Sequence, residues 1–364
     1  MKNKISALIL PIVLAMPLYG GPGCSVPQND GGIYKTTDAG KNWEQTIAIE
    51  GDDKNNLSKA DTEQLLIDPN NPNVVFLVTK SNGLYVSNQF GASWRRIIPE
   101  TDTVYSIEAD PRINGLFYAS ILLNDRAKIV KSENGGQDWK EVYTEAGKGN
   151  YVTQIRVDPF FENNLIAANS EGLLVRSSNG GNTWQATFPF QDSVIDLAFD
   201  SEKENSIWAL TTKGVWHSQD GGLGFDLLSL DPSGEMGSSF YLLRKNKDGL
   251  FLATDKGFYL SRDEGNTWRK IITLNNPADF PARDFVALPG NNGGNPSSAK
   301  AVAGKWAMGA GMTLYLTMDG GENWKPIQFE IDRMVNAIAV KPDNPNQILV
   351  GVETVKRGAF GLGR

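Results

Sequence analysis

The sequence predicts an all-β fold of repeated four-stranded sheets, and three observations support this prediction. A phrase of eight residues, written SRDEGNTW at 261–268, occurs seven times along the 364-residue chain. Six of the nine tryptophans close a copy of it, and the closing aromatic residues stand 41 to 56 residues apart. The 38 Gly and 18 Pro residues supply the turns that short antiparallel strands require. A period in the forties indicates a repeat architecture, and a ring of like sheets is the all-β solution to it.

The shared pattern of the phrase is hydroxyl–x–Asp/Asn–x–Gly–x–x–Trp. Its copies occupy 36–43, 87–94, 132–139, 177–184, 218–225, 261–268 and 317–324. Gln89 replaces the acidic or amide residue in the second copy, and Phe225 replaces tryptophan in the fifth. We expect these two turns to be the weakest.

Residues 151–190 show how one repeat is built. An alternating strand ends at Asp158-Pro159, two short strands follow at 165–170 and 173–177, and a fourth strand follows the phrase at 182–188. Four short antiparallel strands in about 40 residues form one blade of a β-propeller. A single blade cannot bury both faces of its sheet, so the blades must stack around a ring. The same order of strands recurs at 61–87, 103–132, 193–218 and 238–261.

The two ends of the chain decide the number of blades. The first copy, at 31–43, has no strands of its own kind before it, and residues 334–353 supply two strands with no phrase after them. Together they complete one blade, which predicts a ring of seven blades, favoured over six or eight. The tail at 357–364 could form a further strand that this hybrid blade does not need.

The phrase is suited to a tight hairpin between the third and fourth strands. Its Asp or Asn can accept backbone N–H groups, its Gly allows a backbone conformation that a Cβ obstructs, and its aromatic residue can pack between blades. The seven copies resemble Asp-box (bacterial neuraminidase) repeats over nearly all of the chain after Cys24. The resemblance implies that the motif lies on the rim opposite the functional face. The structural residues are Asp38, Trp43, Trp94, Asn134, Trp139, Asn179, Trp184, Asp220, Phe225, Asp263, Trp268, Asp319 and Trp324.

The N-terminus has the layout of an export signal. A short basic start precedes an apolar run at 5–18, and small residues follow before Cys24. This resembles a bacterial lipoprotein signal, in which the cysteine is lipidated; an ordinary cleaved signal and an uncleaved anchor are the alternatives. We therefore expect a signal at 1–23, a tether at 24–30 and a propeller at 31–364, in an exported protein of the bacterial cell envelope.

Composition excludes several function classes. A net charge of −7 argues against a nucleic-acid surface. The single cysteine excludes an intrachain disulfide and a cysteine-based zinc cage. DPNNPN (68–73) and KPDNPN (341–346) fit ordinary Asx and Pro turns better than metal loops. We expect a monomer without a metal or a cofactor.

The face opposite the phrase is formed by two sets of loops, which are the connections from a fourth strand to the next blade, such as 46–60, and the turns between second and third strands. Most of these turns carry Lys or Arg, and a ring would gather them near one mouth of the channel, where they could bind an anionic group or an acidic partner. The alternative is that lysines are common in solvated turns. Trp306, placed in the same kind of turn, is either a contact residue or a packing residue. The predicted binding residues are Lys80, Arg126, Lys213, Lys256, Lys305, Trp306 and Arg357.

Two function classes follow from the resemblance. Glycoside hydrolases of the sialidase and xyloglucanase type would need two suitably spaced carboxylates. The chain lacks the Arg-Ile-Pro signature of sialidases. Its repeats predict a single propeller, whereas xyloglucanases resemble two propellers that clamp the polymer. Its only histidine, His217, fits a structural role. The chain also resembles the photosystem II assembly factor family and the ligand-binding domain of sortilin receptors. We expect a non-catalytic platform that binds a protein, peptide or glycan, with a glycoside hydrolase as the alternative. The acidic residues that could reach the open face, among which no pair stands out, are Asp52, Asp53, Asp102, Asp192, Asp255 and Asp284.

Overall fold

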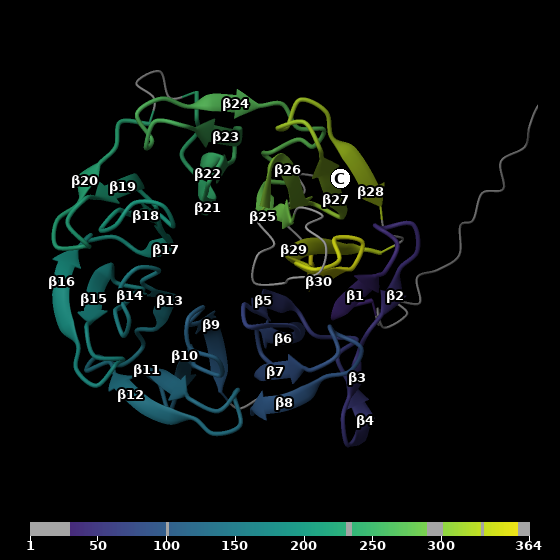
Figure 1. Ribbon diagram of the computed structural model, residues 1–364, viewed down its shortest axis with the longest axis horizontal. Helices are drawn as coiled ribbons and strands as arrows, with labels where there is room; N and C mark the ends of the chain where they lie inside the picture. Colours follow the sequence, from purple (N-terminus) through teal and green to yellow (C-terminus); the bar gives the residue numbers. More distant parts are fainter. Residues whose placement is uncertain (1–29, 100–101, 231–234, 290–300, 329–330, 356–364) are drawn as a thin grey trace, which may run out of the picture.

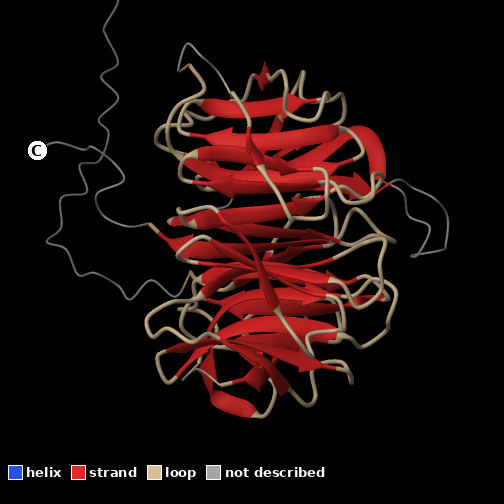
Figure 2. Cartoon of the chain, turned by 90° about the vertical axis from the view of Figure 1, so that its left-hand side faces the viewer, coloured by secondary structure: helices blue, strands red, loops and turns tan. Residues whose placement is uncertain are grey.

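The protein is a seven-bladed β-propeller in which seven four-stranded antiparallel sheets surround a central channel (Figure 1). The computed structural model describes residues 30–99, 102–230, 235–289, 301–328 and 331–355. These segments contain strands and loops (Figure 2), and none of them holds a helix that could cross a membrane. The predicted all-β fold with seven blades is confirmed. The predicted signal at 1–23, Cys24 and the tail at 357–364 lie outside the described residues.

The blades follow one another along the chain, and the first strand of each lines the channel. The hybrid blade contains, from the channel outward, β29 (Arg333–Val340), β30 (Ile348–Thr354), β1 (Ile33–Thr36) and β2 (Glu44–Gln45). The next two blades contain β5 (Thr62–Asp68), β6 (Asn71–Thr79), β7 (Leu84–Ser87) and β8 (Arg95–Ile98), then β9 (Thr103–Ala109), β10 (Phe117–Leu123), β11 (Arg126–Ser132) and β12 (Lys140–Thr144). The fourth and fifth contain β13 (Val152–Val157), β14 (Leu165–Asn169), β15 (Leu173–Ser177) and β16 (Gln185–Pro189), then β17 (Val194–Phe199), β18 (Ile207–Thr211), β19 (Gly214–Ser218) and β20 (Asp226–Leu227). The sixth and seventh contain β21 (Phe240–Asn246), β22 (Gly249–Thr254), β23 (Gly257–Ser261) and β24 (Arg269–Ile271), then β25 (Ala282–Pro289), β26 (Ala301–Ala310), β27 (Thr313–Thr317) and β28 (Lys325–Gln328).

The ring closes where the two ends of the described chain pair in one sheet. Strand β1 lies antiparallel to β30, with Ile33 opposite Gly351 and Thr36 opposite Ile348. The predicted sharing of one blade by N-terminal and C-terminal strands is therefore confirmed. Arg333 reinforces the closure, because its guanidinium bonds to Asp30 and to Asp61, each at 2.9 Å. These contacts join the start of the described chain, the hybrid blade and the blade that follows it.

Every channel-lining strand carries a one-residue bulge near its start, on the face opposite the repeated phrase. A bulge leaves one residue without a partner on the neighbouring strand and redirects its side chain. The same position in all seven blades thus presents a side chain that ordinary strand alternation does not dictate. The bulged residues are Glu63, Tyr105, Thr153, Ile195, Tyr241, Arg283 and Asn336.

The seven repeated phrases form tight turns between third and fourth strands, as predicted; we call them box turns. In the first, the Asp38 carboxylate accepts the backbone N–H groups of Lys41 and Asn42 at 3.0 and 2.9 Å. The Thr36 hydroxyl donates to Asp38 and accepts the N–H of Gly40, whose φ of 85° is a conformation that favours glycine. Hydroxyl, acidic residue and glycine therefore act as one hydrogen-bonded unit.

The aromatic residue that closes each box turn packs against the preceding blade. Trp94 is fully buried among residues of the hybrid blade such as Leu349, and Phe225 packs with Ile166 and Leu174 of the fourth blade. The Trp184 indole N–H donates to the carbonyl of Val142 in the blade before it. The box turns thus join neighbouring blades through apolar contacts, which supports their predicted structural role.

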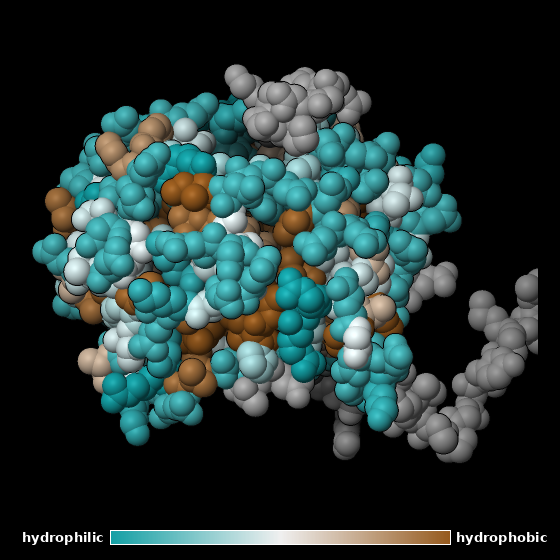
Figure 3. Space-filling model, turned by 60° about the horizontal axis from the view of Figure 1, so that its bottom comes forward, coloured by the Kyte–Doolittle hydropathy of each residue, from teal (hydrophilic) through white to brown (hydrophobic). Residues whose placement is uncertain are grey.

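Apolar packing between blades leaves a mainly polar exterior. Buried clusters lie between successive sheets, for example around Phe76 and Phe117, whose ring centroids are 4.4 Å apart. On the face seen in Figure 3 the surface is largely hydrophilic, and brown apolar side chains show in recesses.

One predicted connection has a different form. We expected 46–60 to be an open-face loop that presents Asp52 and Asp53. The structure instead places β3 (Ala48–Ile49) and β4 (Asp52–Asn56) in a hairpin at the outer rim, where the Glu50 N–H donates to the Trp94 carbonyl (Figure 1). Both aspartates lie on this hairpin, so their expected placement on the open face is wrong.

The box turns predict how stability responds to acid. Hydrogen bonds from Asn42 lower the pKa of Asp38 from 3.8 to about 2, so its contribution is present above pH 3.8 and is lost as the pH falls towards 2. The second box turn has Gln89 at this position and lacks the carboxylate. We predict that Gln89→Asp raises the Tm at pH 7 by about 1–3 °C, and that this gain disappears between pH 4 and pH 2.

The matched control is Asp263→Asn. This variant recreates the pair found in the fourth box turn, where Asn179 is followed four residues later by Thr183, because Asp263 is likewise followed by Thr267. Hydrogen bonding from Thr267 lowers the pKa of Asp263, so this variant should lose less stability than the wild type on acidification over the same range. Thermal unfolding from pH 7 to pH 2 measures both. A Gln89→Asp variant whose Tm difference from wild type is independent of pH would refute the role of the carboxylate.

Candidate binding site in the central channel

The central channel holds a cavity of about 710 Å³ lined by the first strands of the blades. It extends from the bulged residues at the mouth, such as Glu63 and Arg283, to the first-to-second loops, where Pro69 and Pro111 lie. Those loops share the rim of the box turns; for example, the Gly180 N–H of one box turn donates to the carbonyl of Asn163. The mouth therefore lies on the face opposite the box turns.

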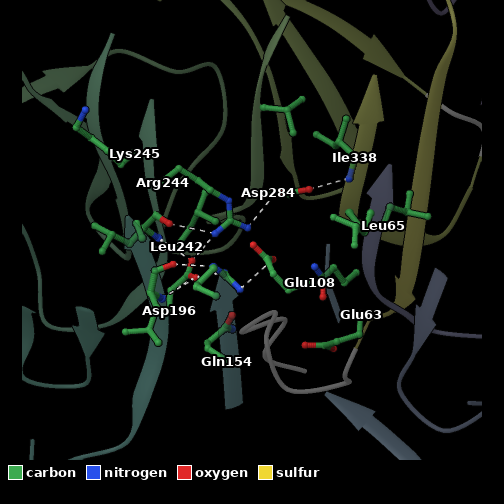
Figure 4. Close-up of a pocket in the computed structure, with 18 of the residues that line it drawn as sticks. Glu63, Leu65, Glu108, Gln154, Asp196, Leu242, Arg244, Lys245, Asp284 and Ile338 are labelled. Atoms are coloured by element: carbon green, nitrogen blue, oxygen red, sulfur yellow. Dashed lines mark hydrogen bonds and ion pairs between the residues drawn. The ribbon is translucent and has the colours of Figure 1, made fainter. Parts of the chain in front are cut away.

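A chain of ion pairs runs around part of the channel wall and links five successive blades (Figure 4). Glu108 lies 3.9 Å from Arg156, which is 2.9 Å from Asp196. Arg244 pairs with Asp196 and reaches Asp284 at 3.2 Å. Charges buried in a protein interior are tolerated when they are paired and hydrogen-bonded, and here each blade supplies the partner of the next.

The same side chains satisfy the free edges of the innermost strands. An edge strand leaves backbone N–H and C=O groups unpaired. The Gln64 side chain both donates to and accepts from the backbone of Ile107, at 2.9 and 3.0 Å. Asp196 accepts the N–H of Leu243, and Asp284 accepts the N–H of Ile338 at 2.8 Å. These polar groups therefore act as structural caps of the channel wall.

At the mouth, a lysine sits between two glutamates. Lys80 forms an ion pair with Glu353 and lies 3.6 Å from Glu63. Burial raises the pKa of Glu63 against the opposing effect of Lys80. Burial also raises the pKa of Glu108 against the effect of Arg156.

Tyrosines and one arginine also lie at the mouth. The rings of Tyr105 and Tyr151 stack at 4.5 Å between centroids. The guanidinium of Arg283 lies over the ring of Tyr241, 5.0 Å from its centroid. Tyr105, Tyr241 and Arg283 are bulged residues, so the bulges of different blades bring them to one level of the channel.

The predicted basic ring is only partly assembled. Lys80, Arg126, Lys213 and Lys256 do lie at turns between second and third strands. Of these, Lys80 lines the cavity with its charge paired, and the Lys213 backbone N–H donates to the carboxylate of Asp192. Arg357 lies outside the described residues. The predicted binding role of the ring stays a prediction.

The expected placement of Lys305 and Trp306 in an open turn is wrong. Strand β26 runs from Ala301 to Ala310, so both residues lie within it, next to Gly304, whose carbonyl accepts a bond from Gly320 of a box turn. Trp306 is fully buried, and its indole N–H donates to Asp248 at 2.7 Å. Its glycine-rich surroundings resembled a turn, but the real turn is formed at Gly311.

Of the predicted open-face acids, Asp192 and Asp255 cap turns. Asp192 accepts from Thr212, and Asp255 accepts the N–H groups of Ser238 and Ser239. Asp284 lies in the channel wall.

His217 is buried, stacks on Trp208 and lies 2.9 Å from the Ser206 hydroxyl, which suits a structural role. Within the described segments, no three His, Cys, Asp or Glu side chains are grouped so as to hold a metal ion.

Most residues that build the channel wall were not predicted from the sequence, and Asp284 was expected only as an acid that could reach the open face. A signal was present, because Gln64, Arg156, Asp196 and Arg244 are polar or charged residues that stand next to apolar residues within first strands. A charged residue in a buried strand requires a partner, and that requirement could have identified these positions as wall residues.

Comparison with known proteins places the fold. No family model matches the chain. Xyloglucanase Xgh74A of Acetivibrio thermocellus is 24% identical over 262 residues, which are 67% of this chain and 29% of that protein. The superposition on the GH74 xyloglucanase of Xanthomonas campestris has a TM-score of 0.65 at 15% identity. It covers 80% of this chain and 51% of the xyloglucanase chain. YCF48 bound to D1 peptide has a TM-score of 0.57 at 15% identity, over 81% of this chain and 94% of that one. The chain thus spans less than a third of its curated xyloglucanase relative and nearly all of YCF48.

The ion-pair chain predicts which acid the fold depends on. Asp196→Ala leaves Arg156 and Arg244 without their shared partner. We expect it to lower the free energy of unfolding by about 2–4 kcal/mol, below the cost for a fully buried pair because the Arg244 side chain is 35% exposed. Urea unfolding measures this. Glu133→Gln, which removes a carboxylate that is 74% exposed from a surface pair, should cost less than about 1 kcal/mol. Equal costs for the two variants would contradict the structural role of the network.

Proposed function

We propose that the protein is a non-catalytic binding platform that holds a peptide segment of a partner protein at the mouth of the channel. The observation that carries this proposal is that each carboxylate lining the cavity is ion-paired, whereas tyrosines and one arginine at the mouth are not used by the wall. The five carboxylates are Glu63, Glu108, Asp196, Asp284 and Glu353.

The paired carboxylates are poorly suited to glycoside hydrolysis. That reaction needs one protonated acid and a second carboxylate free to act as nucleophile or base. Asp196 and Asp284 are bonded to arginines and accept backbone N–H groups, which fixes their positions in the channel wall. Their role in the channel wall leaves them no freedom for acid–base chemistry.

Fold similarity and surface chemistry support a binding role. YCF48, which has the same fold at a TM-score of 0.57, was solved with a D1 peptide bound. Stacked tyrosines offer large, rigid contact surfaces, and aromatic residues are enriched at the energetic centres of protein interfaces.

A glycoside hydrolase acting on xyloglucan is the second candidate. Two observations favour it: the 24% identity to a xyloglucanase over 262 residues, and the raised pKa of Glu108, which would make it a better proton donor. A glycan ligand held without turnover is an intermediate case.

Two further assignments belong to the proposal. The hydrogen bonding of the box turns supports membership of the Asp-box repeat propellers. The basic start and apolar run before Cys24 support export to the cell envelope with a lipid anchor at that cysteine. Labelling with a palmitate analogue tests the anchor, and incorporation that persists in Cys24→Ala would exclude it.

The binding role predicts the behaviour of mouth variants. Peptides selected from a displayed random library against the protein should bind with micromolar affinity, and Tyr105→Ala should weaken binding about 30-fold, as for an interface hot spot. Asn182→Ala in an exposed box turn serves as the matched control and should leave binding unchanged. Titration calorimetry measures both variants. Selected peptides that bind Tyr105→Ala as tightly as wild type would contradict a site at the mouth.

The same preparation decides between the two candidates. We expect no release of reducing ends when the wild type is incubated with xyloglucan. Turnover that Glu108→Gln abolishes while the variant keeps its Tm would establish the hydrolase instead.

A further inference from the structure

Arg283 differs from the other cations of the channel wall. Its Nε is buried and has no hydrogen-bond partner, and its guanidinium forms no ion pair with a residue in the described part of the chain. A buried guanidinium donor without an acceptor is costly, and such groups normally have a partner. Among the described residues that line the cavity, Arg283 is therefore the cation whose guanidinium is not held by a carboxylate.

The remaining cations that line the cavity are all paired. Lys80 faces Glu353, and Arg156 and Arg244 share Asp196. Lys245 lies 3.2 Å from Asp200. Each of these four cations already has a carboxylate partner. The cation of the lining that a ligand anion could pair with is therefore Arg283.

The surroundings of Arg283 prepare it for a planar anion. The ring of Tyr241 lies against the guanidinium, which restricts the plane in which its N–H groups point. A guanidinium held in this way donates two parallel hydrogen bonds, the geometry that fits a carboxylate. The bulges of β21 and β25 set both side chains at the mouth, within reach of a ligand that enters from the open face.

The charges of the cavity favour a monoanion over a dianion. Its lining contains five cationic residues and five carboxylates, so it has no excess of positive charge to offset the second charge of a dianion such as a phosphate monoester. Glu63, which interacts electrostatically with Arg283, would repel that second charge. A single carboxylate matches the single unpaired guanidinium. The cationic residues are Lys80, Arg156, Arg244, Lys245 and Arg283, and the carboxylates are Glu63, Glu108, Asp196, Asp284 and Glu353.

We propose that Arg283, supported by Tyr241, binds a carboxylate of the peptide held at the channel mouth. This inference rests on the proposed binding function and names the group that the site recognises. Recognition is through side chains, because the backbone edges of the innermost strands are capped at several blades by groups such as Gln64 and Asp284 and are not free to pair with a peptide strand there.

The test uses a small probe with and without the charge. N-acetyl-phenylalanine should shift the Arg283 Nε–Hε resonance in a saturable titration in the millimolar range, and its carboxamide should bind at least tenfold more weakly. Arg283→Gln should abolish the difference between acid and amide. Arg283→Lys, which keeps the charge but loses the two-pronged geometry, should bind the acid several-fold more weakly and serves if the Gln variant does not fold. Arg262→Gln, in an exposed box-turn position on the opposite face, is the matched control and should bind like the wild type.

Each outcome separates this inference from the platform itself. Equal binding of acid and amide, or an acid preference that survives Arg283→Gln, overturns the carboxylate site. Glucuronate binding without N-acetyl-phenylalanine binding overturns the peptide assignment. Selected peptides that bind the mouth without any preference for a carboxylate overturn the role of Arg283 but not the platform, whereas probe binding without any peptide ligand supports Arg283 and contradicts the platform.

Discussion

Pairing of β1 with β30 closes the ring, and the rest of the structure depends on that closure. It brings seven first strands around one channel and leaves their inner edges facing each other. Each edge needs hydrogen-bond partners, and side chains such as Gln64 and Asp284 supply them from the neighbouring blade. The channel wall is therefore polar because the fold requires it, before any function is considered.

This requirement separates the structural residues of the channel from those available for a ligand. Asp196 is held by two arginines and two backbone N–H groups, so its position is fixed. Among the bulged residues at the mouth, Asn336 still donates to a neighbouring first strand, at the carbonyl of Thr62. Tyr105, Tyr241 and Arg283 instead form aromatic and cation–π contacts, so they can differ from blade to blade. A repeated constraint thus produces a uniform wall, and the mouth is where one blade can differ from another.

The fold could be predicted from the sequence because its signals are local. The Asp38 turn depends on residues within five positions of one another, and the shared blade follows from what each end of the chain lacks. The binding site could not be predicted in the same way. Glu108, Arg156 and Asp196 come together only when three blades stack. The residues of β25 do not indicate that a bulge occurs at Arg283. A local signal was misleading at Trp306, because the glycine-rich stretch around it resembles a turn but forms part of strand β26.

Hydrogen–deuterium exchange with a selected peptide bound tests most directly whether the open mouth is the functional face. We expect exchange to slow on binding at the starts of β5, β9, β21 and β25, around Glu63, Tyr105, Tyr241 and Arg283, and to stay unchanged at the box turns. Slower exchange confined to the box turns, with the mouth unaffected, would contradict a binding site at the mouth.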